Sequence, residues 1–136
     1  MRTGSELLEH TAEVRLRVRA PTFGELAAEA GRALARLQLG REPPPGEGPW
    51  RRLAVRAPDR EAVLVDWLNE LVFLAEAERW VATEFAVEAA TDRELRVRAR
   101  GVAVDRAPAR VKAATFHGLT VASVPGGVEA EVVLDV

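Results

Sequence analysis

The second half of this 136-residue chain consists of segments in which apolar and charged residues alternate, a period of two that is typical of half-buried β-strands. The clearest is 95–104, where Leu95 and Val97 would face a core while the arginines between them face solvent. Further strands are expected at 81–89, 111–124 and 128–134. Consecutive strands of this kind exclude a doubly wound parallel sheet.

Two helices are predicted in the first half. Thr22 and Glu25 form a capping box ahead of an apolar stripe with helical spacing, and Gly40 is the expected C-cap. Pro58 and Asp59 open the second helix, whose apolar positions between 63 and 74 cover a face wider than a surface helix needs. This second helix is therefore expected at the centre of the core.

The remaining segments complete one domain, residues 1–136. Strands are expected at 13–19 and 50–57, separated by the first helix and a Pro/Gly-rich surface loop at 41–49. The order is β-α-β-α-β-β-β-β. It predicts an α+β fold with two helices packed on one side of a mixed, largely antiparallel β-sheet.

Composition excludes several classes of function. With 48% hydrophobic and 29% charged residues the chain is ordinary globular material, and no apolar run is long enough to cross a membrane. The absence of cysteine excludes disulfides, cysteine–zinc sites, iron–sulfur clusters and thiol catalysis, and fits a reducing cytoplasm. The acidic N-terminal segment is unlike a secretory signal peptide.

Lys112 is the exception among the basic residues, because the other 18 of the 19 Lys and Arg residues are Arg. An ammonium is a compact point charge and a guanidinium is a flat fork, so the two are not interchangeable in a tight site. The alternative is an edge-strand lysine that blocks association between sheets.

A second candidate site is the carboxylate pair at the end of the last strand. The Asp135 side chain and the Val136 carboxylate lie within one residue of each other, and a third acid such as Glu13 would complete a group that attracts Ca²⁺ or Mg²⁺. The alternative is a frayed, solvated tail.

Enzymatic signals are weak. His10 and His117 have no metal-ligand partner three or four residues away, and the chain has no Walker loop, dinucleotide fingerprint or nucleophile elbow. No catalytic residue is therefore assigned, and the chain is predicted not to be an enzyme.

Outward-facing arginines offer a third candidate, a basic face for RNA phosphate. This face would carry no interleaved aromatic residues for base stacking, so pairing with Glu88, Glu129 or Glu131 on neighbouring strands is the preferred account. Its members are Arg15, Arg17, Arg19, Arg52, Arg56, Arg96, Arg98 and Arg100.

Four blocks of sequence resemble the archease family, in the family's order and near its spacing. They are HTAEV (10–14), VDWLNELVFL (65–74), VKAATFHGL (111–119) and VVLDV (132–136). The match spans nearly the whole chain, and the second and third blocks with the terminal aspartate are its most specific parts.

The resemblance implies a small, non-catalytic, cytoplasmic accessory protein that activates an RtcB-type RNA ligase, promoting its guanylylation and its multiple turnover in tRNA splicing and RNA repair. It also implies a Ca²⁺ site, or a site for another divalent cation, held by Glu13, Asp135 and Val136. Lys112, with His10 and His117, would act on the partner. Glu13 stands where the family usually has Asp, and Ca²⁺ tolerates such a change better than Mg²⁺ does.

Two alternatives remain open. One is a chaperone-like partner of a tRNA methyltransferase. The other is an RNA-binding module that uses the arginine face, with Arg96, Arg98 and Arg100 in contact with RNA. In the ligase reading, contact with RNA is indirect and no membrane is involved.

Overall fold

The computed structural model describes residues 1–10, 13–106, 108 and 111–136, without the side chains of Glu9 and His10. Within these residues the chain forms seven strands and two helices. In chain order they are β1 (Gly4–His10), β2 (Glu13–Ala20), α1 (Phe23–Leu39), β3 (Glu47–Arg56), α2 (Arg60–Glu78), β4 (Trp80–Ala90), β5 (Glu94–Ala103), β6 (Ala113–Val124) and β7 (Gly127–Asp135).

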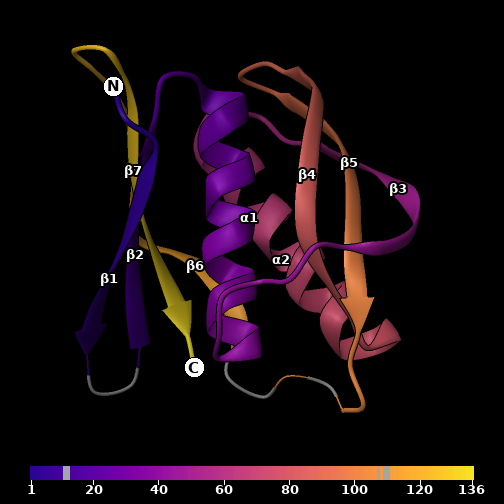
Figure 1. Cartoon of the computed structure of the whole chain (residues 1–136). Helices are drawn as coiled ribbons and strands as arrows, with labels where there is room; N and C mark the ends of the chain where they lie inside the picture. The colour runs from indigo at the N-terminus through magenta and orange to yellow at the C-terminus, as the bar shows by residue number, and fades with distance from the viewer. Residues whose placement is uncertain (11–12, 107, 109–110) are drawn as a thin grey trace.

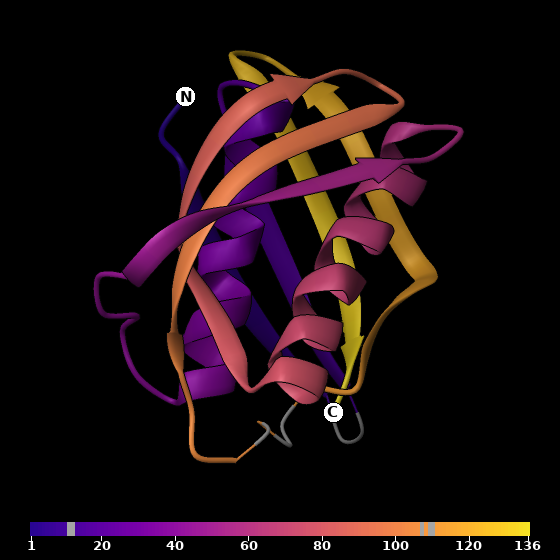
Figure 2. The same cartoon turned by 90° about the vertical axis from the view of Figure 1, so that its right-hand side faces the viewer.

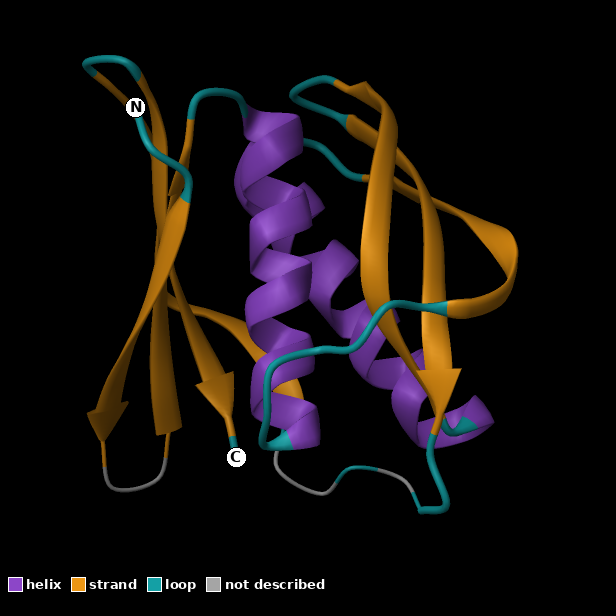
Figure 3. Ribbon diagram, in the orientation of Figure 1, coloured by secondary structure: helices purple, strands orange, loops and turns teal. Residues whose placement is uncertain are grey.

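The strands form two sheets with both helices between them (Figures 1 and 3). One sheet has four strands in the order β1-β2-β7-β6, and the other has three in the order β3-β5-β4. Every pairing in the described part of the chain is antiparallel. Viewed from the three-stranded side, Figure 2 shows that sheet in front of the helices and the four-stranded sheet behind them.

The α+β class, with two helices and antiparallel strands, is confirmed, but the prediction of a single mixed sheet is wrong. The strands that begin at Glu13 and Glu47 belong to different sheets, and the helices lie between the sheets instead of on one side. The physical reason is visible in α2, whose buried side chains cover more than half of its circumference. A helix that is apolar on so much of its circumference can cover two sheets at once.

The predicted helix ends are confirmed. The Thr22 hydroxyl accepts a hydrogen bond from the Glu25 N–H (3.2 Å), and the Asp59 carboxylate accepts one from the Ala62 N–H (2.8 Å). Gly40 closes α1 in the left-handed conformation, with φ of 70°. These caps satisfy backbone groups that the helices leave free.

Trp67 joins the layers at the centre of the core. Its side chain is fully buried, and its indole N–H donates to the Ala27 carbonyl of α1 (2.9 Å). Its ring meets that of Phe85 on β4 edge-to-face, with centroids 5.8 Å apart. Gly31 of α1 lies against the same Phe85 ring, where a Cβ would come within 2.7 Å. This close approach explains a glycine in the middle of a helix.

Two boundaries differ from prediction. Strand β1 was not expected, because Glu6-Leu7-Leu8-Glu9 does not alternate cleanly, yet the segment pairs along its full length with β2. The surface loop predicted at 41–49 ends earlier, since β3 begins at Glu47. A register shift between Glu47 and Arg51 lets the strand accommodate Gly48 and Pro49. The irregular segment predicted at 105–110 falls partly outside the described residues.

No helix in the described part of the chain combines the length and the apolar character that a membrane crossing requires.

Candidate functional site

Three of the singled-out segments meet at one end of the four-stranded sheet. Glu13 on β2 lies directly opposite Asp135 on β7, and Asp135 in turn lies opposite Ala113 at the start of β6. The Lys112 N–H donates to the Asp135 carbonyl (2.8 Å). Residues more than 120 positions apart in sequence are therefore neighbours through backbone pairing alone.

Glu13 and Asp135 lie on the outer face of this sheet. The next pair along the same strands, Val14 and Leu134, faces the helices, and alternation turns the two acids the other way. Side chains directly opposite on antiparallel strands are close neighbours, so these two carboxylates repel each other. Neither forms an ion pair within the described residues.

This donor set fits a hard divalent cation. Two carboxylates without a cationic partner, on strands that hold them in register, supply the oxygen ligands that Ca²⁺ prefers. Across the residues that the structure describes, no three His, Asp or Glu side chains gather closely enough to hold a metal. Oxygen atoms beyond these two side chains would thus have to complete the coordination, and Val136 directly follows Asp135.

Two further predicted residues, Lys112 and His10, belong to this end of the four-stranded sheet. Lys112 is exposed, with its backbone tied to Asp135. The backbone of His10 lies opposite Glu13, while its side chain and residues 11–12 lie outside the description.

Asn69 is a residue that the sequence analysis missed. It lies on α2, where its side-chain carbonyl accepts from the Ala114 N–H (2.7 Å) and its amide donates to the Ala114 carbonyl (3.1 Å). The side chain thus pairs with β6 as a neighbouring strand would. The available signal was a single amide within the apolar block VDWLNELVFL, since a polar side chain in such a helix needs a partner.

His117 lies on a bulge of β6, away from the Glu13–Asp135 row. Thr115 pairs with Val133 and Thr120 with Glu131, so four residues of β6 stand opposite one residue of β7. Gly118 has a φ of 67°, which confirms the predicted bulge at this glycine. The bulge leaves His117 exposed and Phe116 60% exposed.

A model of the Archease protein family matches residues 6–136. The chain belongs to the archease family. The archease of Methanosarcina mazei is 30% identical over 96% of this chain and 94% of its own length, and that of Methanosarcina acetivorans matches with the same identity and coverage.

Solved structures agree. The solution structure of Methanobacterium thermoautotrophicum protein 1598 matches with a TM-score of 0.77 and 25% identity, over 98% of this chain and 99% of that one. An archease from Thermotoga maritima, described as a possible chaperone, matches with a TM-score of 0.62 over 100% of this chain and 98% of that one. At 17% identity, this second likeness shows the shared fold alone.

The arginines of this archease do not form one face. Arg15, Arg17 and Arg19 lie on the four-stranded sheet, while the arginines of β3 and β5 lie on the other sheet. Arg17 donates to Glu131 (2.7 Å), as the pairing alternative predicted, and this hydrogen bond raises the pKa of the Arg17 guanidinium above its ordinary value.

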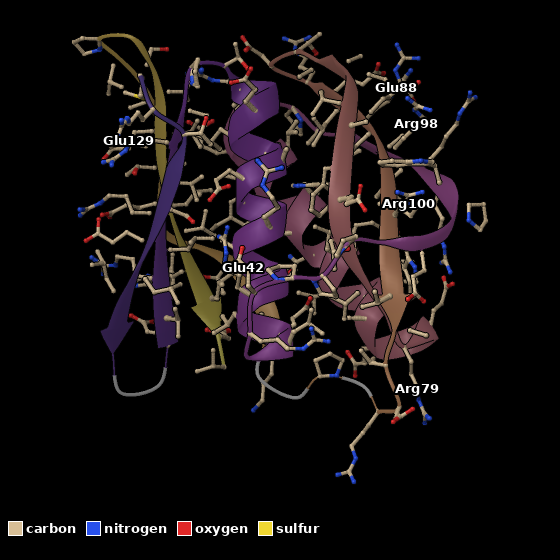
Figure 4. All side chains as sticks on the ribbon, viewed as in Figure 1. Glu42, Arg79, Glu88, Arg98, Arg100 and Glu129 are labelled. Carbon is tan, nitrogen blue, oxygen red and sulfur yellow. The ribbon has the colours of Figure 1, made fainter. Side chains whose placement is uncertain are left out.

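Arg96, Arg98 and Arg100 point away from the helices on the three-stranded sheet, as Figure 4 shows for Arg98 and Arg100. The predicted pairing of an arginine with Glu88 is confirmed. The predicted absence of an aromatic residue on this face is wrong, because Trp50 lies beside two of its guanidinium groups. The ion pairs are Arg96–Glu94 (3.1 Å), Arg98–Glu88 (3.8 Å) and Arg100–Glu84 (3.4 Å).

Proposed function

We propose that this archease is a non-catalytic accessory protein that activates an RtcB-type RNA ligase, promoting the guanylylation of the ligase and its multiple turnover. The acting surface is the end of the four-stranded sheet that carries Glu13, Lys112 and Asp135. The observation that supports this most is the convergence of three family blocks on that end through strand pairing. The surface is exposed at Lys112 and Asp135, as contact with a partner requires.

A divalent cation, with Ca²⁺ the expected ion, belongs to this proposal. Glu13 and Asp135 would hold it, together with an oxygen atom of Val136. When bound, the ion would offset the repulsion between the two facing carboxylates and add local positive charge. Glu13 is one methylene longer than the usual family Asp, and the flexible coordination of Ca²⁺ accommodates that difference.

Lys112 and Asp135 would act as one unit. The bond from the Lys112 N–H to the Asp135 carbonyl fixes the start of β6 to the end of β7, and Asn69 fixes the next residue but one, Ala114, to α2. The Lys112 ammonium is therefore carried on backbone that is anchored on two sides. We assign it the role of placing a positive point charge against an anionic group of the ligase, its nucleotide or its RNA end.

His117 would contact the same partner from the β6 bulge, and His10 from the end of β1. None of these groups is assigned the role of nucleophile, so the joining chemistry stays on the ligase.

A chaperone-like role beside a tRNA methyltransferase is the second candidate. Phe73 on α2 is 57% exposed and Phe116 on the bulge is 60% exposed, and exposed phenylalanines suit contact with apolar surface on another protein. Such a role would survive the loss of the Glu13 and Asp135 carboxylates.

The test is RNA joining by the cognate ligase with substrate in excess, with and without this protein. We expect joining to pass one turnover only when the protein is present. Asp135→Asn and Lys112→Met should abolish the effect, while Glu129→Gln, on the outer face of the same strand β7, should retain it. Lys112→Arg keeps the charge and tests whether a compact ammonium is needed.

Circular dichroism would establish that each variant is folded, and calorimetric titration with CaCl₂ would report the cation site directly. If Asp135→Asn and Lys112→Met both activate the ligase like the wild type, this assignment of the surface is wrong. If wild-type protein changes nothing while the ligase is active alone, ligase activation itself is wrong and protection of a methyltransferase from aggregation is the next assay.

A further inference from the structure

The outer face of the three-stranded sheet is distinct from the end that carries Glu13 and Asp135. We propose that this face binds single-stranded RNA directly, through Trp50 and the arginines of β3 and β5. The evidence is an exposed tryptophan among guanidinium groups, a net positive charge and a depression lined mostly by charged side chains.

Trp50 supplies the aromatic component. Its side chain is 38% exposed, and the guanidinium groups of Arg100 and Arg98 lie 4.9 Å and 5.7 Å from its ring centroid. An indole that is held by cation–π contacts and still reaches solvent can stack on a base, as can the guanidinium planes beside it. Stacking of this kind tolerates any sequence, because every base has a π-face.

The described part of this face is positive overall, since it carries five arginines and three glutamates. Arg52 lies opposite Arg98 in the strand register, and no ion pair involves Arg52 within the described residues. Each paired arginine meets its glutamate through part of a guanidinium that has five N–H donors, so donors remain for phosphate. The set is Arg52, Arg56, Arg96, Arg98 and Arg100, with Glu84, Glu88 and Glu94.

The shape of this face suits an extended strand of nucleic acid. A depression is lined by Arg52, Leu53, Ala54, Glu88 and Arg96. Ala54 lies opposite Arg96, and Ala86 lies opposite Arg98, so small side chains separate the arginines across the sheet. Alternate residues of β5 place Arg96, Arg98 and Arg100 in a row at intervals of about 6.7 Å along the strand.

RNA is favoured over a protein partner because charged side chains make up most of the lining of this depression, namely Arg52, Glu88 and Arg96. Tight protein interfaces centre on large apolar or aromatic side chains in pockets, whereas here the lining is mostly charged. The choice of RNA over DNA rests on the proposed function, which brings the chain to an RNA-joining enzyme. The surface itself recognises only phosphate charge and base faces.

The experiment is a titration of the full chain, without ligase, against a fluorescein-labelled oligouridine of twelve nucleotides, read by anisotropy. Arg52→Glu/Arg96→Glu reverses two charges on the proposed face. Arg19→Glu/Arg41→Glu makes the same charge change at exposed positions elsewhere and is the matched control. We expect the first pair to weaken binding at least about tenfold and to reduce the dependence of log K on log salt by roughly 1.4, the value for two lost phosphate contacts.

Tryptophan fluorescence gives a second readout. Trp67 is fully buried and Trp80 is 7% exposed, so quenching by unlabelled oligouridine reports Trp50. The quenching should disappear in Trp50→Leu and persist in the Arg19→Glu/Arg41→Glu control.

The proposal is overturned if wild-type protein does not bind the RNA at low salt, or if both charge-reversal pairs weaken binding equally. A tenfold preference for the matching DNA would overturn the assignment to RNA. Because the titration contains no ligase, its failure leaves ligase activation intact, and failure of the ligase assay leaves this binding measurement intact.

Discussion

The outer faces of the two sheets have opposite charge, although both are built from strands in which arginine alternates with apolar residues. Among the described residues, three arginines face five acids on the four-stranded sheet, whereas five arginines face three acids on the three-stranded sheet. An Arg-x-Arg pattern thus does not by itself predict a basic surface, because the neighbouring strand decides what each arginine meets. The acids of the first face are Glu6, Glu13, Glu129, Glu131 and Asp135.

This difference concerns binding more than stability. Exposed ion pairs contribute about 0–1 kcal/mol each, so neither face holds the fold together. Both faces depend on the helices between the sheets, and each should respond separately to changes on its own surface.

Trp67→Ala should have the largest effect, because it should destabilise the whole fold and thereby disrupt both outer faces together. The fully buried indole contacts α1 and β4, and truncating such a ring costs about 3–5 kcal/mol, a large part of the stability of a domain. Urea unfolding followed by circular dichroism measures the loss. A cost below about 1 kcal/mol would show that Trp67 does not join the layers as described.

Asn69→Ala should impair the function proposed for the four-stranded sheet and leave that of the three-stranded sheet unchanged. Its loss leaves the Ala114 N–H and carbonyl without their partner, at a cost of about 1–3 kcal/mol, and it frees the segment that carries Lys112. Hydrogen exchange at the Ala114 amide should accelerate and ligase activation should fall, while RNA binding stays unchanged. Glu70→Ala on the same helix is the control. Unchanged exchange at Ala114 would contradict the role given to Asn69.

Glu13→Gln tests the acidic face, because its effect on stability should change sign when Ca²⁺ is added. Without divalent cations the variant should be more stable than the wild type by about 0.2–1 kcal/mol, because it relieves repulsion with Asp135. Millimolar CaCl₂ should reverse the order, since a ligand stabilises only the protein that binds it. Melting temperatures in EDTA and in CaCl₂ test this, with Glu6→Gln as the control. Equal stabilisation of both proteins by CaCl₂ would exclude Glu13 as a ligand.

Glu88→Gln should have the smallest effect and should touch only the basic face. It releases Arg98 from a long 3.8 Å ion pair, so stability should change by less than about 0.5 kcal/mol. Affinity for oligouridine should rise about two- to threefold as one negative charge leaves the face. Glu129→Gln on the other sheet should leave this affinity unchanged, and a weaker complex with Glu88→Gln would contradict the charge argument.

Local features of the fold were predictable from sequence because they depend on neighbouring residues. The caps at Thr22, Gly40 and Asp59 and the glycine bulge at 118 are of this kind. The division into two sheets was not predictable from sequence, because it depends on which strands, distant in sequence, pair with one another on each side of the helices. Strand β1 was missed because its pairing with β2 supplies what its own pattern lacks.

The candidate site divides in the same way. Lys112 stood out in the sequence as the single lysine, and Asp135 stood out as the acid that follows the last apolar strand. Only the strand register shows that Glu13 lies opposite Asp135. Asn69 could not be assigned, since its partner is a backbone 45 residues away. The aromatic character of the basic face was missed because Trp50 lies within the register shift between Glu47 and Arg51, where alternation no longer predicts the face.

The register shifts of the edge strands also affect how the molecule behaves at high concentration. Edge strands expose unpaired backbone groups, which can recruit strands from other molecules and start aggregation. Of the four edge strands in the described residues, β3, β4 and β6 each carry a break in register, and Asn69 pairs with both backbone groups of Ala114 on β6. Strand β1 has an uninterrupted register and an exposed Leu7. If copies of this chain stick together in a concentrated solution, β1 is the edge at which the contact should form.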